Sequence, residues 1–121
     1  MFTIIEIRGK EYKLKLRTVD VVRLEKKLGH SLMDMFMGMQ DDRIPQLGEL
    51  LAIVHASMGA YNHGISENAF YDLYDAYVDE GHNMFDLIPI VLELMQNGGI
   101  IPKDVEEPIE GIVDAELKPV E

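Results

Sequence analysis

The sequence contains no cysteine and no tryptophan, and its basic residues are few. Without cysteine there can be no disulfides, thiolate metal sites, iron–sulfur clusters or cysteine nucleophiles, which is in keeping with a reducing cytoplasm. Eleven lysines and arginines stand against 22 aspartates and glutamates, giving a net charge of −11. This balance disfavours a protein that wraps a nucleic acid duplex, because such binding depends on neutralising phosphates. No apolar run approaches the roughly 18 residues of a membrane span, so no membrane partner is expected.

The 121 residues are 47% hydrophobic, which suits one domain with a single core. The last twenty residues differ, with seven acidic residues and three prolines against two bases. We therefore expect a folded domain over residues 1–101 and an acidic flexible tail over residues 102–121. Charge is also uneven along the chain: residues 1–29 carry a net +4 and the remainder a net −15. Such asymmetry can steer one copy of a protein toward another.

Alternating apolar and charged residues predict a β-hairpin over residues 2–17. The dipeptide Gly9-Lys10 is typical of a two-residue type II′ turn. That turn predicts the following pairs: Ile7 with Tyr12, Ile5 with Leu14, Thr3 with Leu16, Arg8 with Glu11, and Glu6 with Lys13. One face of the hairpin is then apolar and the other has opposite charges abreast. Two strands alone are marginal in water, so the apolar face must pack on helices.

Helical periodicity and capping residues predict about five helices after the hairpin. They are expected near residues 18–28, 31–39, 45–62, 66–80 and 83–97, with Thr18, Ser31 and Ser66 as N-caps. The helix over 45–62 is apolar nearly all round, so it should be the central, buried one. Pro45 suits its first position, and Pro89 either kinks the last helix or marks a restart. The predicted fold class is α+β, mainly α, with an N-terminal hairpin on a helical bundle.

Side chains with catalytic potential are present but do not form a recognisable constellation. The four histidines are His30, His55, His63 and His82. No two of them have the i, i+4 spacing of a helical metal site. No serine sits in a nucleophile elbow. We expect no catalytic residues, no cofactor, no metal site and no enzymatic activity.

Methionine is concentrated in one short helix, with four of the eight methionines within residues 33–39. Leu32, Phe36 and their helical neighbours form one apolar face, which is ample for the core. Met33 and Met37 lie roughly 100–140° around the helix from Leu32. They form a candidate partner-binding patch, because methionine adapts to varied apolar surfaces. The alternative is that both faces are buried between the hairpin and the central helix.

Two oppositely charged faces are candidates for self-association. The basic residues are Lys13, Lys15 and Arg17, and the acidic residues are Asp72, Asp75, Asp79 and Glu80. Because the two faces belong to different elements, joining them gives a head-to-tail contact, which produces rings or spirals rather than closed dimers.

The order of these elements resembles that of the tail assembly chaperones of long-tailed bacteriophages and prophages, especially those of Gram-positive hosts. The segments that carry the resemblance are RTVDVVRLEKKLGHSLMDMF at residues 17–36 and HGISENAFYDLYDAYVDEG at residues 63–81. The resemblance covers most of residues 2–97. It implies a protein that self-associates into spirals and coats the tape measure protein until tail tube subunits polymerise around it.

The resemblance further implies that the tape measure and tail tube proteins are partners and that nucleic acid is not. It places the protein in the cytoplasm of the bacterial host and not in the mature virion. It assigns no functional residue by position. A second function remains open from the residues alone, namely an acidic inhibitor that mimics nucleic acid. Such an inhibitor would need carboxylates at phosphate-like spacing, for which the helix near residues 66–80 is the candidate.

Overall fold

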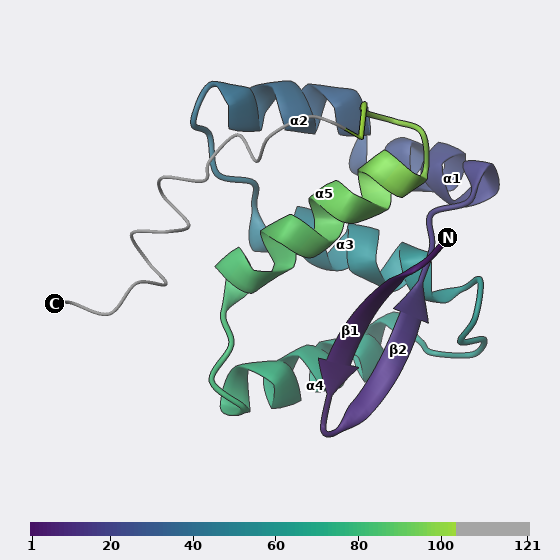
Figure 1. Cartoon of the computed structure of the whole chain (residues 1–121), viewed down its shortest axis with the longest axis vertical. Coiled ribbons are helices and arrows are strands. Elements are labelled where there is room, and N and C mark those ends of the chain that lie inside the picture. The colour runs from purple at the N-terminus through teal and green to yellow at the C-terminus, as the bar shows by residue number, and fades with distance from the viewer. Residues whose placement is uncertain (104–121) are drawn as a thin grey trace, which may run out of the picture.

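A computed structural model describes residues 1–103, and Figure 1 shows a β-hairpin followed by a bundle of helices. The elements are β1 (Thr3–Ile7), β2 (Lys10–Leu14), α1 (Thr18–Leu28), α2 (Leu32–Gln40), α3 (Leu47–Met58), α4 (Glu67–Asp79), a 3-10 turn η1 (Met84–Asp86) and α5 (Leu87–Asn97). The predicted fold class is confirmed for this part of the chain. The predicted acidic tail lies outside the described residues, apart from its first two.

The hairpin forms where it was predicted, but the predicted register was wrong by two residues. The observed pairs are Thr3 with Leu14, Ile4 with Lys13, Ile5 with Tyr12, Glu6 with Glu11, and Ile7 with Lys10. The turn residues are therefore Arg8 and Gly9, with φ angles of 55° and 73°. Positive φ at both positions is the property of a type I′ turn. A shift of two residues preserves which side chains face inward, but it places Glu6 opposite Glu11 instead of Lys13.

The central position of α3 is confirmed. It contacts α1, α4, α5 and β2, and it lies behind α5 in Figure 1. Its fully buried side chains include Leu50, Ile53 and Val54. The helix is shorter than predicted, because it starts after Gln46 rather than at Pro45 and ends at Met58 rather than near residue 62. Leu47, the first residue of the helix, and Tyr61, which lies beyond its end, are exposed.

Caps fix the starts of the helices, and one differs from the prediction. Arg17, not Thr18, is the N-cap of α1. Its backbone N–H donates to Asp20 Oδ2 at 2.9 Å, and its guanidinium contacts both oxygens of the same carboxylate at 2.9 and 3.1 Å. Ser31 and Ser66 cap α2 and α4 as predicted, each accepting a backbone N–H with its side-chain oxygen.

The last two helices close the core from either side of α3. On α4 the buried side chains are Phe70, Ala76 and Tyr77, whereas Ala69 is exposed. Pro89 is the third residue of α5, in the first turn, where a missing N–H removes no helical hydrogen bond. The proline therefore accompanies a restart after η1 rather than a kink.

Candidate functional site

The described residues contain no group of three or more histidine, aspartate or glutamate side chains that could hold a metal ion. Two histidines have structural partners instead. His55 Nε2 lies 2.7 Å from the Ile65 carbonyl oxygen and so secures the loop between α3 and α4. His82 stacks on the ring of Tyr77, with centroids 4.0 Å apart. Burial, helped by nearby carboxylates, raises the pKa of Tyr77 to about 12, so this phenol stays neutral.

Across residues 1–103 no helix combines the length and the apolar character needed to cross a membrane.

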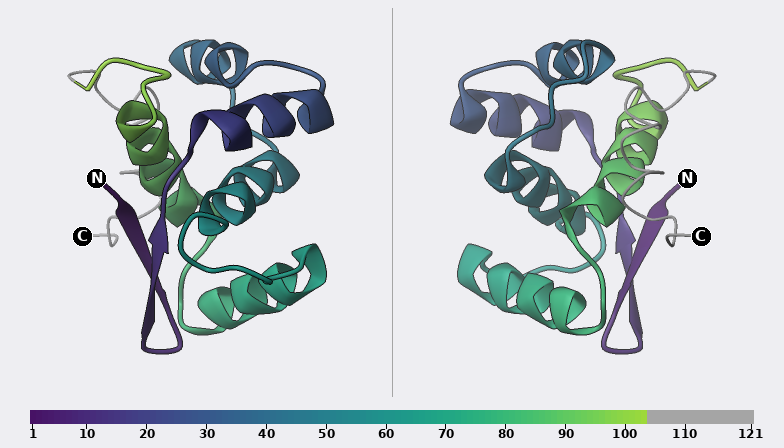
Figure 2. Two further views of the ribbon diagram at one scale, coloured as in Figure 1. Left: turned by 90° about the vertical axis from the view of Figure 1, so that its right-hand side faces the viewer. Right: turned by 90° about the vertical axis from the view of Figure 1, so that its left-hand side faces the viewer.

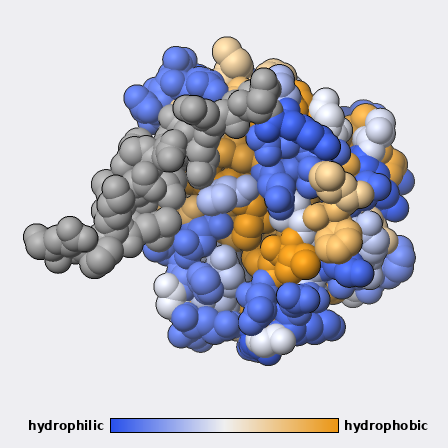
Figure 3. All heavy atoms as spheres, in the orientation of Figure 1, coloured by the Kyte–Doolittle hydropathy of each residue, from blue (hydrophilic) through white to orange (hydrophobic). Residues whose placement is uncertain are grey.

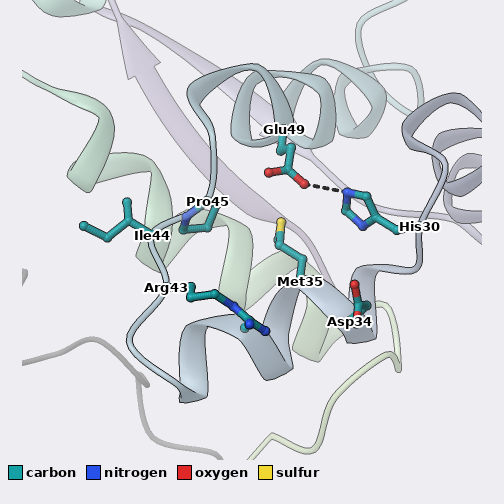
Figure 4. Close-up of a pocket in the computed structure, with 8 residues that line it drawn as sticks. His30, Asp34, Met35, Arg43, Ile44, Pro45 and Glu49 are labelled. Atoms are coloured by element: carbon teal, nitrogen blue, oxygen red, sulfur yellow. Dashed lines mark ion pairs between the residues drawn. The ribbon is translucent and has the colours of Figure 1, made fainter.

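An open cavity of about 370 Å³ lies between α2, α3 and the loop that joins them (Figure 4). On one side of it His30 Nε2 is 2.6 Å from Glu49 Oε2. His30 Nδ1 is 3.1 Å from the Ser31 carbonyl oxygen. Both partners are acceptors, so the protonated imidazole, which donates from both ring nitrogens, satisfies both contacts. The Ser31 carbonyl, together with the nearby carboxylates of Glu49 and Asp34, raises the pKa of His30.

This ion pair joins the turn before α2 to the first turn of α3, and so it fixes the placement of α2. Arg43 packs from the other side of the cavity, where a Cβ on Gly38 would lie only 3.2 Å from its Nε. Glu25 adds a third restraint, because its carboxylate accepts the Leu32 backbone N–H at 2.8 Å. Together these three contacts hold α2 in place against the rest of the fold.

The predicted face of α2 is exposed: Met33 is 41% exposed and Met37 is 53% exposed. Leu32, Met35, Phe36 and Met39, on the opposite face, are buried. The alternative in which both faces are covered is therefore wrong. The two exposed side chains are one turn apart and lie on the same side of the helix. We refer to Met33 and Met37 as the methionine pair.

The two predicted charged faces are each reduced by one residue, which forms a contact within the chain. Arg17 is held by Asp20, as described above. The Glu80 carboxylate accepts the Arg8 backbone N–H at 2.6 Å and so links the tip of the hairpin to the end of α4. No local pattern could have predicted a contact between residues 72 positions apart. Within residues 1–103 the other predicted side chains form no ion pair, although Lys13 Nζ lies over the Phe2 ring; they are Lys13, Lys15, Asp72, Asp75 and Asp79.

Sequence reasoning missed an apolar patch on the outer face of β1. Phe2 and Ile4 are 42% and 40% exposed, and the Phe2 ring meets the exposed Tyr61 edge-on at 6.1 Å. Figure 3 shows hydrophobic atoms gathered over β1 on this face of the molecule. The signal was present in the sequence, because Phe2 and Ile4 are apolar at the positions that alternate with the inward Thr3 and Ile5. We refer to Phe2 and Ile4 as the β1 patch.

Comparison with known proteins found no match among curated proteins or solved structures. A family model does match, and it spans residues 3–119, which is nearly the whole chain. It describes a family whose function is not known. The chain therefore belongs to the family of unknown function DUF6096.

Proposed function

We propose that this protein is a tail assembly chaperone of a long-tailed bacteriophage or prophage. In this role it self-associates in the cytoplasm of the bacterial host and coats the tape measure protein until tail tube subunits polymerise. It is then absent from the mature virion. The proposal starts from the resemblance of residues 17–36 and 63–81 to that class of protein. The observation that carries it is the methionine pair, an adaptable apolar surface on a helix whose other face is anchored in the core.

The methionine pair suits weak binding repeated over many copies. Full burial of a methionine side chain contributes about 1.5–3 kcal/mol, and about half of each side chain is already buried in the free chain. Covering the rest of both would therefore contribute about 2 kcal/mol, far too little for stable capture by one copy. Self-association multiplies this contact along a long client, because linked sites bind with high effective concentration. A chaperone that coats its client in this way needs both properties.

The test compares two double variants in the capture of a recombinant tape measure segment. Met33→Gln with Met37→Gln removes the methionine pair. Val19→Gln with Val22→Gln is the matched control, because these α1 side chains are 42% and 49% exposed. We expect the methionine variant to bind the segment about thirtyfold more weakly, which corresponds to about 2 kcal/mol, while the control binds as the unaltered chain does.

Circular dichroism must show the same helical signal for both double variants. Equal loss of binding in the two would assign the effect to general surface polarity and contradict the role of the methionine pair. Unchanged binding of the segment by both double variants would also contradict the role of the methionine pair.

The geometry of α4 does not favour the nucleic acid mimic. Asp72, Asp75 and Asp79 are exposed on one side of the helix, and they span about 10 Å along its axis. A duplex carries one charge per about 1.7 Å, or about six over that length. The three carboxylates supply about half of that charge density. The neighbouring Glu80 carboxylate accepts the Arg8 backbone N–H.

A further inference from the structure

The outer edge of β1 is an unpaired strand edge. Ile7 and Lys10 flank a two-residue turn and form a hydrogen-bonded pair, so hydrogen-bonded and non-hydrogen-bonded pairs alternate from there along the ladder. Ile4 and Glu6 fall on the non-hydrogen-bonded positions, where the backbone N–H and C=O point away from β2. Within residues 1–103 these groups have no hydrogen-bond partner. The next outward N–H, that of Arg8, is already taken by Glu80.

Within residues 1–103 this edge has little of what protects exposed strands, since β1 carries one charged residue, Glu6, and no lysine or proline. Natural proteins usually place lysine, proline or a bulge on a free edge, or cover the edge with another element. The β1 patch instead places exposed apolar side chains there. Figure 2 shows the hairpin at the margin of the fold; α4 and α5 contact β1, and within residues 1–103 no strand other than β2 pairs with it. An edge of this kind is a template for another strand.

We propose that a second copy of this chain pairs with the edge, β1 running antiparallel to β1, to form a four-stranded sheet across a two-fold axis. The register follows from the groups that are free. With Ile4 opposite Ile4 of the second copy, Phe2 lies opposite Glu6, and the outward N–H and C=O groups make about six hydrogen bonds. A register shifted toward the turn would require the Arg8 N–H, which Glu80 occupies. This contact needs no client, so it goes beyond the proposed function.

Charge complementarity favours a second copy as the occupant. Glu6 faces Glu11 across the hairpin, and neither has a cationic partner within the described chain. Lys13 Nζ lies 4.8 Å from the centre of the Phe2 ring. Because Glu6 comes to lie opposite Phe2 of the second copy, its carboxylate meets Lys13 of that copy. The two-fold axis generates this ion pair twice and relieves the repulsion between the two glutamates.

The test measures dimerisation by sedimentation equilibrium in a background of Asp72→Asn, Asp75→Asn and Asp79→Asn, which removes the acidic face of α4. We expect dimers in this background. Glu6→Lys and Lys13→Glu should each weaken dimerisation about tenfold, since each alters two symmetry-related pairs. The double variant Glu6→Lys with Lys13→Glu restores complementarity and should return to within about threefold of the background. A monomeric background, or a double variant as weak as the single ones, would overturn the proposal.

Ile4→Pro tests the backbone contact separately. The Ile4 N–H is unpaired in one chain, so proline removes no hydrogen bond of the fold but blocks pairing at the edge. In the same background we expect this variant to be monomeric, and we expect Ile4→Thr, which keeps the N–H, to dimerise. Dimerisation of the proline variant to the same extent as the background would overturn the proposal. Should the proline variant fail to fold, the charge-reversal cycle decides alone.

Amide exchange followed by NMR reports the edge directly. As concentration rises, the amides of Ile4 and Glu6 should gain protection, while those of Ile5 and Ile7, which already face β2, should not change. If the amides of Ile4 and Glu6 gained protection only when a tape measure segment is added, the edge of β1 would bind that segment. This result would overturn the proposed pairing between two copies.

Discussion

Head-to-tail self-association makes a prediction that depends on both charged faces at once. A chain with Lys13→Glu and Lys15→Glu should not grow into large species, and neither should a chain with Asp72→Lys and Asp75→Lys. In each variant the two faces have the same sign, so a head-to-tail contact is repulsive. When the two variants are mixed, every contact joins opposite charges again. The mixture should therefore assemble, with the two chains alternating.

The size of this effect follows from the exposure of the groups. Lys13 and the aspartates of α4 are exposed and Lys15 is half-buried, so each pair is worth about 0–1 kcal/mol. Turning two attractive pairs into repulsive ones should therefore cost about 2 kcal/mol, or about thirtyfold in the association constant. Apolar contacts must supply the rest of the affinity, with charge setting direction and rate. The effect should be larger at low salt, because the screening length falls from roughly 14 Å at about 0.05 M to roughly 4 Å at about 0.5 M.

Sedimentation velocity is the suitable assay, and the readout is species larger than two copies. The paired edge of β1 gives dimers at most, so it does not mimic growth. The unaltered chain and the mixture should both show large species that shrink as salt rises, and each variant alone should not. A mixture that stays as small as its components would refute the reasoning. So would an unaltered chain that is a monomer or a closed dimer at every salt concentration.

Three further predictions concern stability. The pKa of His30 is raised, so its ion pair with Glu49 contributes its full stabilisation below about pH 6.5, the ordinary histidine pKa. This stabilisation is lost as pH rises through the raised pKa. Glu49→Gln should therefore lower the urea midpoint of unfolding more at pH 6 than at pH 9. Burial acts to raise the pKa of Asp20, but the hydrogen bonds from Arg17 outweigh it and hold that pKa below its usual value. Asp20→Asn should therefore cost about 1 kcal/mol at pH 7, or about 4–8 °C in the thermal midpoint, and the difference should shrink as pH falls through the lowered pKa. Removing residues 104–121 should lower that midpoint by less than about 5 °C, because this segment has few apolar residues for its charge.

The fold could be predicted from the sequence where one periodicity dominated. Inward and outward positions of the hairpin were predicted correctly despite the wrong turn, because an error of two residues does not change the face of a side chain. The turn itself was mistaken because Arg8 adopts positive φ, which is uncommon for residues other than glycine, asparagine and aspartate. In this case Glu80, far along the chain, accepts the Arg8 N–H.

The candidate site was predicted in part, for a related reason. Helical geometry placed the methionine pair on a face of its own, but it left open whether another element covers that face, and only the structure shows both side chains exposed. The roles of Arg17 and Glu80 were not predictable from their charges. Arg17 forms an ion pair with Asp20, and the Glu80 carboxylate accepts the Arg8 backbone N–H. The β1 patch was missed because alternation favours polar outward residues, and Phe2 and Ile4 do not follow that pattern.

The central claim is that this chain keeps an apolar partner in solution by coating it. The most direct measurement is the soluble fraction of the tape measure protein when it is produced with and without this chain. We expect a large increase in soluble protein and a co-purifying complex with several copies of this chain per tape measure molecule. Substitution of the methionine pair by glutamine should reduce both, whereas the Val19 and Val22 control should not. A tape measure protein that is equally soluble without this chain, or that never co-purifies with it, would contradict the account.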